Sequence, residues 1–208
     1  MNKIKTKRIY ATYILILLNV FLFALEVKTG GSKDINTLSY LGALIPIKVL
    51  YGQWWRVISA NFLHYGFMHL SSNMVALYVL GKLIEINLGI IRYLFIYLFS
   101  GIGAMLSYTI LSLFRGDNYT ILVGASAAIM GLVGALLAIS SYVWFKKKTP
   151  LNAKRLRFII MVIIIQFVFD NLIPQVSFHS HLFGLIFGFL LGMIILFLKL
   201  NFPVGDRA

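Results

Sequence analysis

The chain has 208 residues, of which 60% are hydrophobic and 12% charged, and its 19 Lys and Arg against 6 Asp and Glu give a formal net charge of +13. Soluble domains carry about 25% charged residues, so this composition excludes a water-soluble globule, and the long apolar runs between the basic residues argue against a nucleic-acid-binding protein. The chain contains no Cys, which excludes a disulfide, a thiol nucleophile and a thiolate metal site. We therefore expect a single-domain polytopic membrane protein.

Six segments are apolar over about the 20 residues that a helix needs to cross the hydrocarbon. In chain order they are Tyr10–Leu25, Phe62–Leu83, Ile90–Phe114, Leu122–Phe145, Phe158–Ile173 and His179–Leu198. They lack the alternation of apolar and polar residues that is typical of membrane β-strands. The predicted fold class is therefore all-α, a bundle of six transmembrane helices.

Basic residues indicate the orientation of these spans. Fourteen of the nineteen fall in the segments on one side, including the N-terminus (1–9), the loop 146–157 and the tail 199–208. By the positive-inside rule these segments and both termini are predicted to be cytoplasmic. The first span is longer than the apolar part of a signal peptide and no A-x-A site follows, so we interpret it as a retained helix.

A long outer-face loop, residues 27–61, separates the first two spans. It mixes glycine and proline with apolar residues and contains Trp55 and Arg56. Tryptophan and arginine are typical of the membrane interface. We expect part of this loop to form short helices lying in the outer leaflet.

Polar side chains inside apolar spans are candidates for function because their burial in lipid is costly. His64, His69 and Asn73 lie in the second span, Ser126 opens the fourth, and His181 lies near the start of the sixth. These three spans all run from the outside inward in the predicted topology. The residues are therefore expected at a similar shallow depth near the outer face.

Helical spacing refines this expectation for the second span. His69 and Asn73 are four residues apart and share a face, whereas His64 is rotated by roughly 140° from His69. In the fourth span, the small residues from Gly124 to Ala128 open a helix, where free N–H groups and the helix dipole favour a developing anion.

Glycine in the sixth span predicts a close helix contact. His181, Gly184 and Gly188 lie on one face, and glycine allows a neighbouring backbone to approach. Serine is a weak nucleophile until a base takes its proton, and His is the usual base. Ser126 and His181 are therefore the candidate catalytic pair.

Stabilisation of an oxyanion requires hydrogen-bond donors, and His69, the Asn73 amide and the Ser126 N–H are candidates. We consider Asp170 and Glu85 to be the only acidic residues near the spans. Glu85 falls at the cytoplasmic end of the second span. Asp170, near the outer end of the fifth, is a candidate third member, but the spacing does not demand it and we favour a Ser–His dyad.

These motifs together resemble the rhomboid family of intramembrane serine proteases, over roughly Gln53 to Leu198. The resemblance rests on the following motifs: Trp55-Arg56 in the first loop, H-x4-H-x3-N at His64, His69 and Asn73, G-x-S at Gly124 to Ser126, H-x-x-G-x-x-x-G at His181, Gly184 and Gly188, and Glu85 after the second span.

The resemblance implies a rhomboid-like six-helix bundle that cleaves single-pass membrane proteins near their extracytoplasmic ends, without a cofactor. It implies Ser126 as nucleophile, His181 as base, His69 and Asn73 in the oxyanion hole, and a structural role for His64. The sequence departs from the family at Ala127, where Gly is usual, and at Ser180, where Ala is common.

Three alternatives stay open. An inactive relative would bind membrane helices without cleaving them, and Ala127 is the residue that hints at it. A metalloenzyme would use the four His, but H-E-x-x-H is absent and we expect no metal. A transporter would show an inverted repeat, which we do not find.

The surroundings of the protein are predicted from the remaining features. His179 is expected at the interface, in water, and the basic loop 146–157 suits anionic lipid rather than nucleic acid. No organelle presequence precedes the first span. We expect the plasma membrane, with the active site on the extracytoplasmic side, and the sequence leaves the oligomeric state open.

Overall fold

A computed structural model describes residues 9–173 and 177–198, and these residues form nine α-helices and one short 3-10 helix. The elements are α1 (Tyr10–Thr29), α2 (Ile35–Leu41), α3 (Pro46–Leu50), α4 (Arg56–Ser59), the 3-10 helix η1 (Ala60–Phe62), α5 (Phe67–Leu88), α6 (Ile90–Arg115), α7 (Ser126–Lys147), α8 (Pro150–Leu172) and α9 (Phe178–Phe197). The predicted tail 199–208 and all but the last residue of the predicted segment 1–9 lie outside the described residues.

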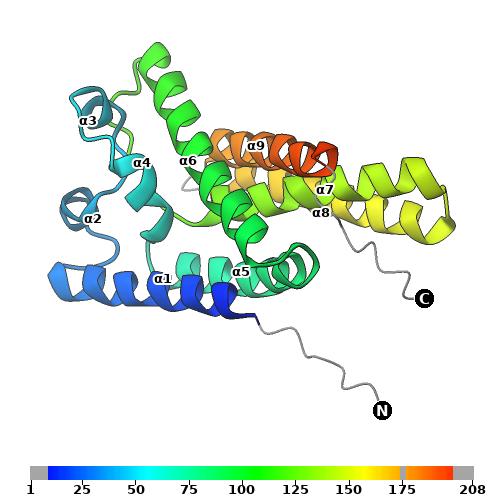
Figure 1. Cartoon of the computed structure of the whole chain (residues 1–208). Helices are drawn as coiled ribbons and strands as arrows, with labels where there is room; N and C mark the ends of the chain where they lie inside the picture. Colours follow the sequence, from blue (N-terminus) through cyan, green and yellow to red (C-terminus); the bar gives the residue numbers. More distant parts are fainter. Residues whose placement is uncertain (1–8, 174–176, 199–208) are drawn as a thin grey trace.

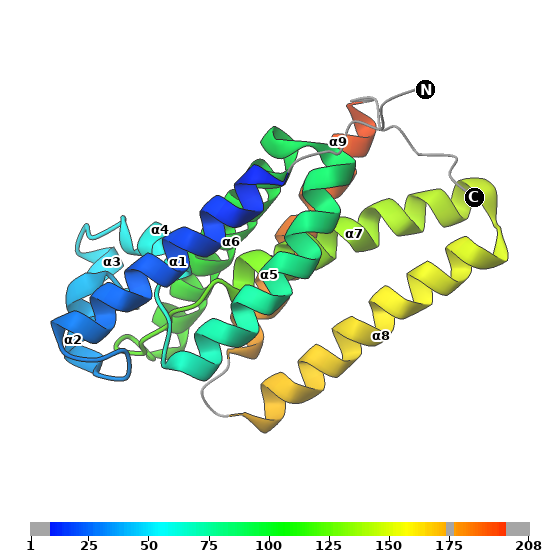
Figure 2. The ribbon, with the colours of Figure 1, turned by 90° about the horizontal axis from the view of Figure 1, so that it is seen from below.

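The long helices form a bundle in which α1, α5, α7, α8 and α9 run roughly along one direction, while α6 crosses them steeply (Figure 1). The short helices α2, α3 and α4 gather at one end of this bundle. The start of α1 and the end of α9 lie at the opposite end. Seen from below, α8 lies at the edge of the bundle beside α7 (Figure 2).

Polarity is inverted relative to a soluble protein. Large apolar side chains such as Leu17, Val75 and Phe114 are exposed on the outer surface of the long helices, at 66%, 66% and 87%. Polar side chains such as Asn19, Asn73 and Ser100 are instead buried. Such an exterior is stable only against lipid, and polar groups in a bilayer must find partners inside the protein. The chain is therefore a multi-pass membrane protein, as its composition predicts.

Five helices in the described part of the chain, α1, α5, α6, α7 and α9, are long and apolar enough to cross a membrane. The fifth predicted span, Phe158–Ile173, coincides with the second part of α8, which begins earlier, at Pro150, with a basic first half, and ends at Leu172. The all-α fold class is confirmed, whereas the count of six spans and the orientation of the termini stay predictions.

Two predicted spans begin too early. The second was expected from Phe62, but α5 starts at Phe67, because Phe62 ends η1 and Gly66 precedes the helix with a left-handed φ of 84°. The fourth was expected from Leu122, but residues 121–125 lie outside the helix, with Leu122 paired to Leu44 in an isolated antiparallel bridge, and α7 starts at Ser126.

The long loop between α1 and α5 does contain short helices, and a buried arginine holds it together. The guanidinium of Arg56 donates from Nη1 to the carbonyl oxygens of Ser39 (2.8 Å) and Ala43 (2.7 Å), and from Nε to Gln53 Oε1 (2.7 Å). Its neighbour Trp55 remains 48% exposed. Arg56 is thus a structural link between α2 and α4.

A glycine seam joins α7 and α9. A Cβ on Gly184 would overlap the carbonyl of Ala127, one on Gly188 that of Gly131, and Gly192 packs on Ala135. The matching steps of four residues in both helices mean that α7 and α9 run parallel. Extending this register places His181 level with Gly124, so the starts of the two helices meet at the same end of the bundle.

Candidate active site

A cavity of about 270 Å³ opens between α5, α7, α8 and α9. Its walls include four of the residues that the sequence singles out, His69, Asn73, Ser126 and His181, together with Asp170. The predicted catalytic and oxyanion residues therefore meet at one place, although they come from different helices.

Ser126 stands at the first position of α7. Its N–H is one of the helix-start donors that have no partner within the helix. Just before it, Gly124 has a φ of 130° and donates from its N–H to the Ala60 carbonyl at 2.9 Å. A Cβ at Gly124 would lie 2.7 Å from His69 Cε1 and 3.5 Å from Ser126 Oγ. Only glycine suits this conformation and this approach, and it lets the imidazole lie beside the serine.

The hydrogen bonding of His69 indicates which ring nitrogen carries the proton. Its Nδ1 accepts from the Tyr65 N–H at 3.3 Å, which assigns the proton to Nε2. Nε2 is the nitrogen on the Gly124 and Ser126 side. Asn73 is 95% buried and uses one amide N–H to donate to the His69 carbonyl at 3.0 Å, which leaves its second N–H available.

His181 is held by a carboxylate. Its Nδ1 lies 2.8 Å from Asp170 Oδ2, and both side chains are almost completely buried. The other oxygen of Asp170 accepts from Gln166 Nε2 at 2.8 Å. The sequence offered Asp170 as a third member that the spacing did not demand, because spacing along the chain does not reveal how α8 packs against α9; the structure brings its carboxylate into contact with His181.

Within the described residues no hydrogen bond joins Ser126 Oγ to His181, although both side chains line the same cavity. Catalytic hydrogen bonds in unliganded enzymes are often long and tighten when substrate binds. The parallel register of α7 and α9 holds the two side chains at neighbouring levels. The packing of α7 on α9 thus keeps Ser126 and His181 near each other.

His64 lies in the turn ahead of α5, outside the cavity lining. It is completely buried, its N–H donates to Glu26 Oε1 at 2.9 Å, and its ring stands edge-on to His69 with centroids 5.3 Å apart. Burial, with a smaller effect of His69, lowers the pKa of His64 to about 3, so the ring is neutral. His64 therefore packs behind His69 and supports it.

Glu26 was missed by the sequence reasoning, which named two acidic residues near the spans. Because α1 continues to Thr29, Glu26 lies within this helix and is fully buried. The sequence did contain an indication of it, because Glu26 is a single acidic residue at the end of the apolar run of the first span. Glu85 lies far from the cavity and accepts from the N–H groups of Ala11 and Thr12, each at 2.9 Å. It therefore caps the start of α1.

Two further expectations concern Ala127 and His179. The methyl group of Ala127 packs with Leu44, Val57 and Met105 and is not part of the cavity wall. His179 is partly exposed and its Nε2 lies 3.1 Å from Arg115 Nη1. In the described part of the chain, no group of three or more His, Asp or Glu side chains is arranged to hold a metal ion.

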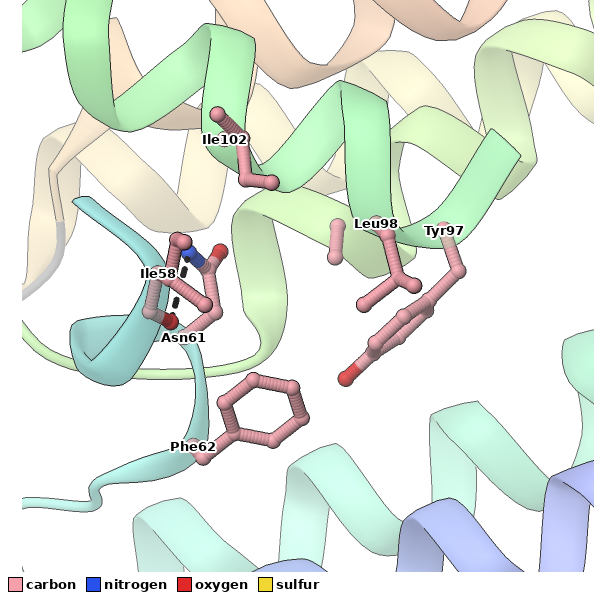
Figure 3. Close-up of a pocket in the computed structure, with 7 residues that line it drawn as sticks. Ile58, Asn61, Phe62, Tyr97, Leu98 and Ile102 are labelled. Carbon is pink, nitrogen blue, oxygen red and sulfur yellow. Dashed lines mark hydrogen bonds between the residues drawn. The ribbon is translucent and has the colours of Figure 1, made fainter. Parts of the chain in front are cut away.

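Two other hollows lie near the cavity. An apolar groove of about 420 Å³ shares His69 and Leu122 with it and continues to Leu38 and Tyr65. A smaller pocket of about 10 Å³ lies among Asn61, Tyr97 and Ile102, where the Asn61 amide donates weakly to the Ile58 carbonyl (Figure 3). This pocket has room for about one water molecule and is too small for a substrate.

Comparison with known proteins supports the sequence motifs. Residues 51–197 match the Rhomboid domain. The chain belongs to the rhomboid family. The matched region of this rhomboid runs from the loop between α1 and α5 to the end of α9 and includes every residue that lines the cavity. The family that the sequence motifs predict is thereby confirmed.

Individual relatives give the same result. The rhomboid protease GluP of Bacillus subtilis (strain 168) is 34% identical over 180 residues, covering 86% of this rhomboid and 33% of GluP. RHOMBOID-like protein 6, mitochondrial, of Arabidopsis thaliana is 39% identical over 162 residues, covering 77% and 50%. YdcA of Bacillus subtilis is 33% identical over 147 residues, covering 70% and 69%. The chain thus spans a third of GluP and half of RHOMBOID-like protein 6.

Proposed function

We propose that this protein is an intramembrane serine endopeptidase with Ser126 as nucleophile and His181 as general base. The observation that carries this proposal is the shared cavity, which Ser126, His181 and the donors His69 and Asn73 all line. Six membrane spans with cytoplasmic termini, and an active site near the extracytoplasmic face of the plasma membrane, complete the proposal.

In the first step, Ser126 Oγ attacks the carbonyl carbon of the scissile peptide bond while its proton passes to His181 Nε2. The tetrahedral intermediate collapses, the peptide C–N bond breaks, and His181 returns the proton to the leaving amine. Water then attacks the acyl-enzyme, with His181 again as base, and releases the carboxylic acid and free Ser126. Each proton taken up by the imidazole is thus returned within the cycle.

Oxyanion stabilisation would come from three donors around Ser126. They are its own backbone N–H at the start of α7, the Nε2–H of His69 and the second N–H of the Asn73 amide. Donors fixed before the reaction favour the charge that develops in the transition state. The close approach of His69 to the chain ahead of Ser126 requires a glycine at position 124, which supports this role for His69.

A substrate helix must unwind to react, because helical peptide carbonyls are hydrogen-bonded and shielded in the membrane. The apolar groove beyond His69 offers space for the unwound segment next to the cavity. Single-pass membrane proteins cleaved near their extracytoplasmic ends are therefore the proposed substrates. The family resemblance adds a small residue at the scissile position.

The direct test uses the purified protein in liposomes with a panel of single-pass substrate helices, and mass spectrometry of the products. We expect cleavage by the parent protein and none by Ser126→Ala or His181→Ala. Ser141→Ala is the matched control, since it lies on the same helix fifteen residues further on, about 22 Å away. Cleavage by Ser126→Ala at the parental rate would refute the proposal, and substrate binding without cleavage by the parent would favour an inactive relative.

A further inference from the structure

Asp170 and His181 form a buried contact between α8 and α9. Nδ1 of His181 lies 2.8 Å from Oδ2 of Asp170, the carboxylate side chain is fully enclosed, and the imidazole is 4% exposed. Phe167 of α8 and Phe178 of α9 pack beside it, with ring centroids 5.0 Å apart. The contact is therefore part of a packed helix interface and not a surface pair.

Gln166 fixes the carboxylate from its other side. Its amide donates to Asp170 Oδ1 at 2.8 Å, so both oxygens of Asp170 have a defined partner. Gln166 lies one helical turn before Asp170 on α8, and both line the cavity. The side chains form a continuous chain from Gln166 through Asp170 to His181.

We propose that Asp170 is a positioning residue that acts through His181, so that the site works as a Ser–His–Asp triad. This inference rests on the proposed function of Ser126 and His181. A carboxylate acceptor at Nδ1 holds the proton on that nitrogen and directs the Nε2 lone pair away from Asp170, as the base requires. Asp170 orients the imidazole and takes no part in the proton transfer between Ser126 and His181.

Charge also favours this arrangement. The ionisable side chains lining the cavity in the described residues are His69 from α5, Asp170 from α8 and His181 from α9, and α7 contributes none. Arg115 of α6 does not line the cavity and contacts His179 instead. Asp170 is thus the anion available to stabilise the imidazolium that forms when Ser126 loses its proton, in surroundings where a buried cation without a partner is costly.

The kinetic test compares Asp170→Asn with the parent protein, with Asn171→Ala as the matched control. Asn171 is the next residue on α8, its side chain is exposed, and its amide donates to the Phe167 carbonyl within the same helix. For Asp170→Asn we expect a fall in kcat of roughly 100- to 10,000-fold with KM within about threefold. Fluorophosphonate labelling of Ser126 should slow in parallel, whereas Asn171→Ala should match the parent in both assays.

A spectroscopic test decides the same point independently of activity. In the parent protein labelled with ¹⁵N-histidine, we expect the His181 ring to carry its proton on Nδ1, with a low-field proton resonance that is absent from Asp170→Asn. The resonances of His181 are assigned by their loss in His181→Gln. This readout needs only the folded parent protein, so it applies even where Asp170→Asn fails to fold or the parent fails to cleave.

The outcomes separate the two proposals. A parental kcat in folded Asp170→Asn, or a parental His181 carrying its proton on Nε2, would overturn the triad and leave the Ser126 protease intact. An equal fall in kcat in Asn171→Ala would also overturn the triad, because it would show that any change in the packing of α8 lowers activity. A parent that neither cleaves nor labels, but shows the Nδ1 proton, would refute the protease and retain the Asp170–His181 pairing.

Discussion

Gly188 of α9 lies directly against the carbonyl group of Gly131 on α7, so closely that a methyl group on Gly188 would overlap backbone atoms. The overlapping atoms belong to the backbone of Gly131, so they cannot rotate away as a side chain would. Together with Gly184 against Ala127 and Gly192 against Ala135, this contact sets the register that brings the starts of the two helices level. The geometry of the proposed site therefore depends on atoms one and two helical turns away from it.

The first prediction concerns this seam. Gly188→Ala should push α9 from α7, lower the thermal unfolding midpoint in detergent by about 5 °C or more, and reduce cleavage, because overpacking typically costs 1–3 kcal/mol or more. Ser141→Ala is the control, since Ser141 lies further along α7, beyond the glycine contacts of the seam. Equal midpoints for Gly188→Ala and the parent would contradict the close packing.

The second prediction concerns Glu85, whose carboxylate accepts from the Ala11 N–H, the Thr12 N–H and the Thr12 hydroxyl. Glu85→Gln should lower stability by about 2–3 kcal/mol, because it replaces a charged acceptor at the start of a helix with an amide. The kcat of the folded fraction should stay close to the parental value. Thermal unfolding measures the first effect, with the exposed Asn87→Ala on the same helix as the control. A loss of kcat without a loss of stability would contradict a capping role.

The third prediction concerns Ala127, which stands where the family usually has glycine. Its methyl group packs with Leu44 and Val57, away from the cavity. Ala127→Gly should therefore leave kcat/KM within about threefold and lower stability by about 1 kcal/mol, since glycine is the poorer helix former. A rise of tenfold or more in kcat/KM would mean that the methyl group obstructs the substrate.

The fourth prediction concerns Asn73. Asn73→Ala removes a donor from the proposed oxyanion hole and should lower kcat roughly 100-fold or more with a smaller change in KM. The expected residual cleavage distinguishes this variant from Ser126→Ala. Initial rates over a range of substrate concentrations provide the measurement, with Asn87→Ala again as the control. A change confined to KM would assign Asn73 to substrate binding instead.

Much of the fold and of the candidate site could be predicted from the sequence, because a helix that crosses lipid must be long and apolar and its polar side chains stand out. Apolar length indicates the helices, and the motif that includes His69 and Asn73 follows from helical spacing. The shared depth of Ser126 and His181 required only the direction of the spans. In the structure, these four residues do line one cavity.

Other features depend on contacts between distant segments and left no periodic signal. The Asp170–His181 contact requires the packing of α8 on α9, and the Glu26–His64 contact joins the end of α1 to the turn ahead of α5. The start of α5 at Phe67 was missed for a related reason. An apolar run continues through η1 and the turn at Gly66, and hydropathy does not distinguish these residues from the helix.

The most direct measurement of the central claim is to identify the residue that a fluorophosphonate probe modifies. The parent protein, reconstituted in liposomes, should form one covalent adduct, and peptide mass spectrometry should locate it on Ser126. His181→Ala should form none. An adduct on another residue, or substrate cleavage by a protein whose Ser126 stays unmodified at saturating probe, would contradict the account.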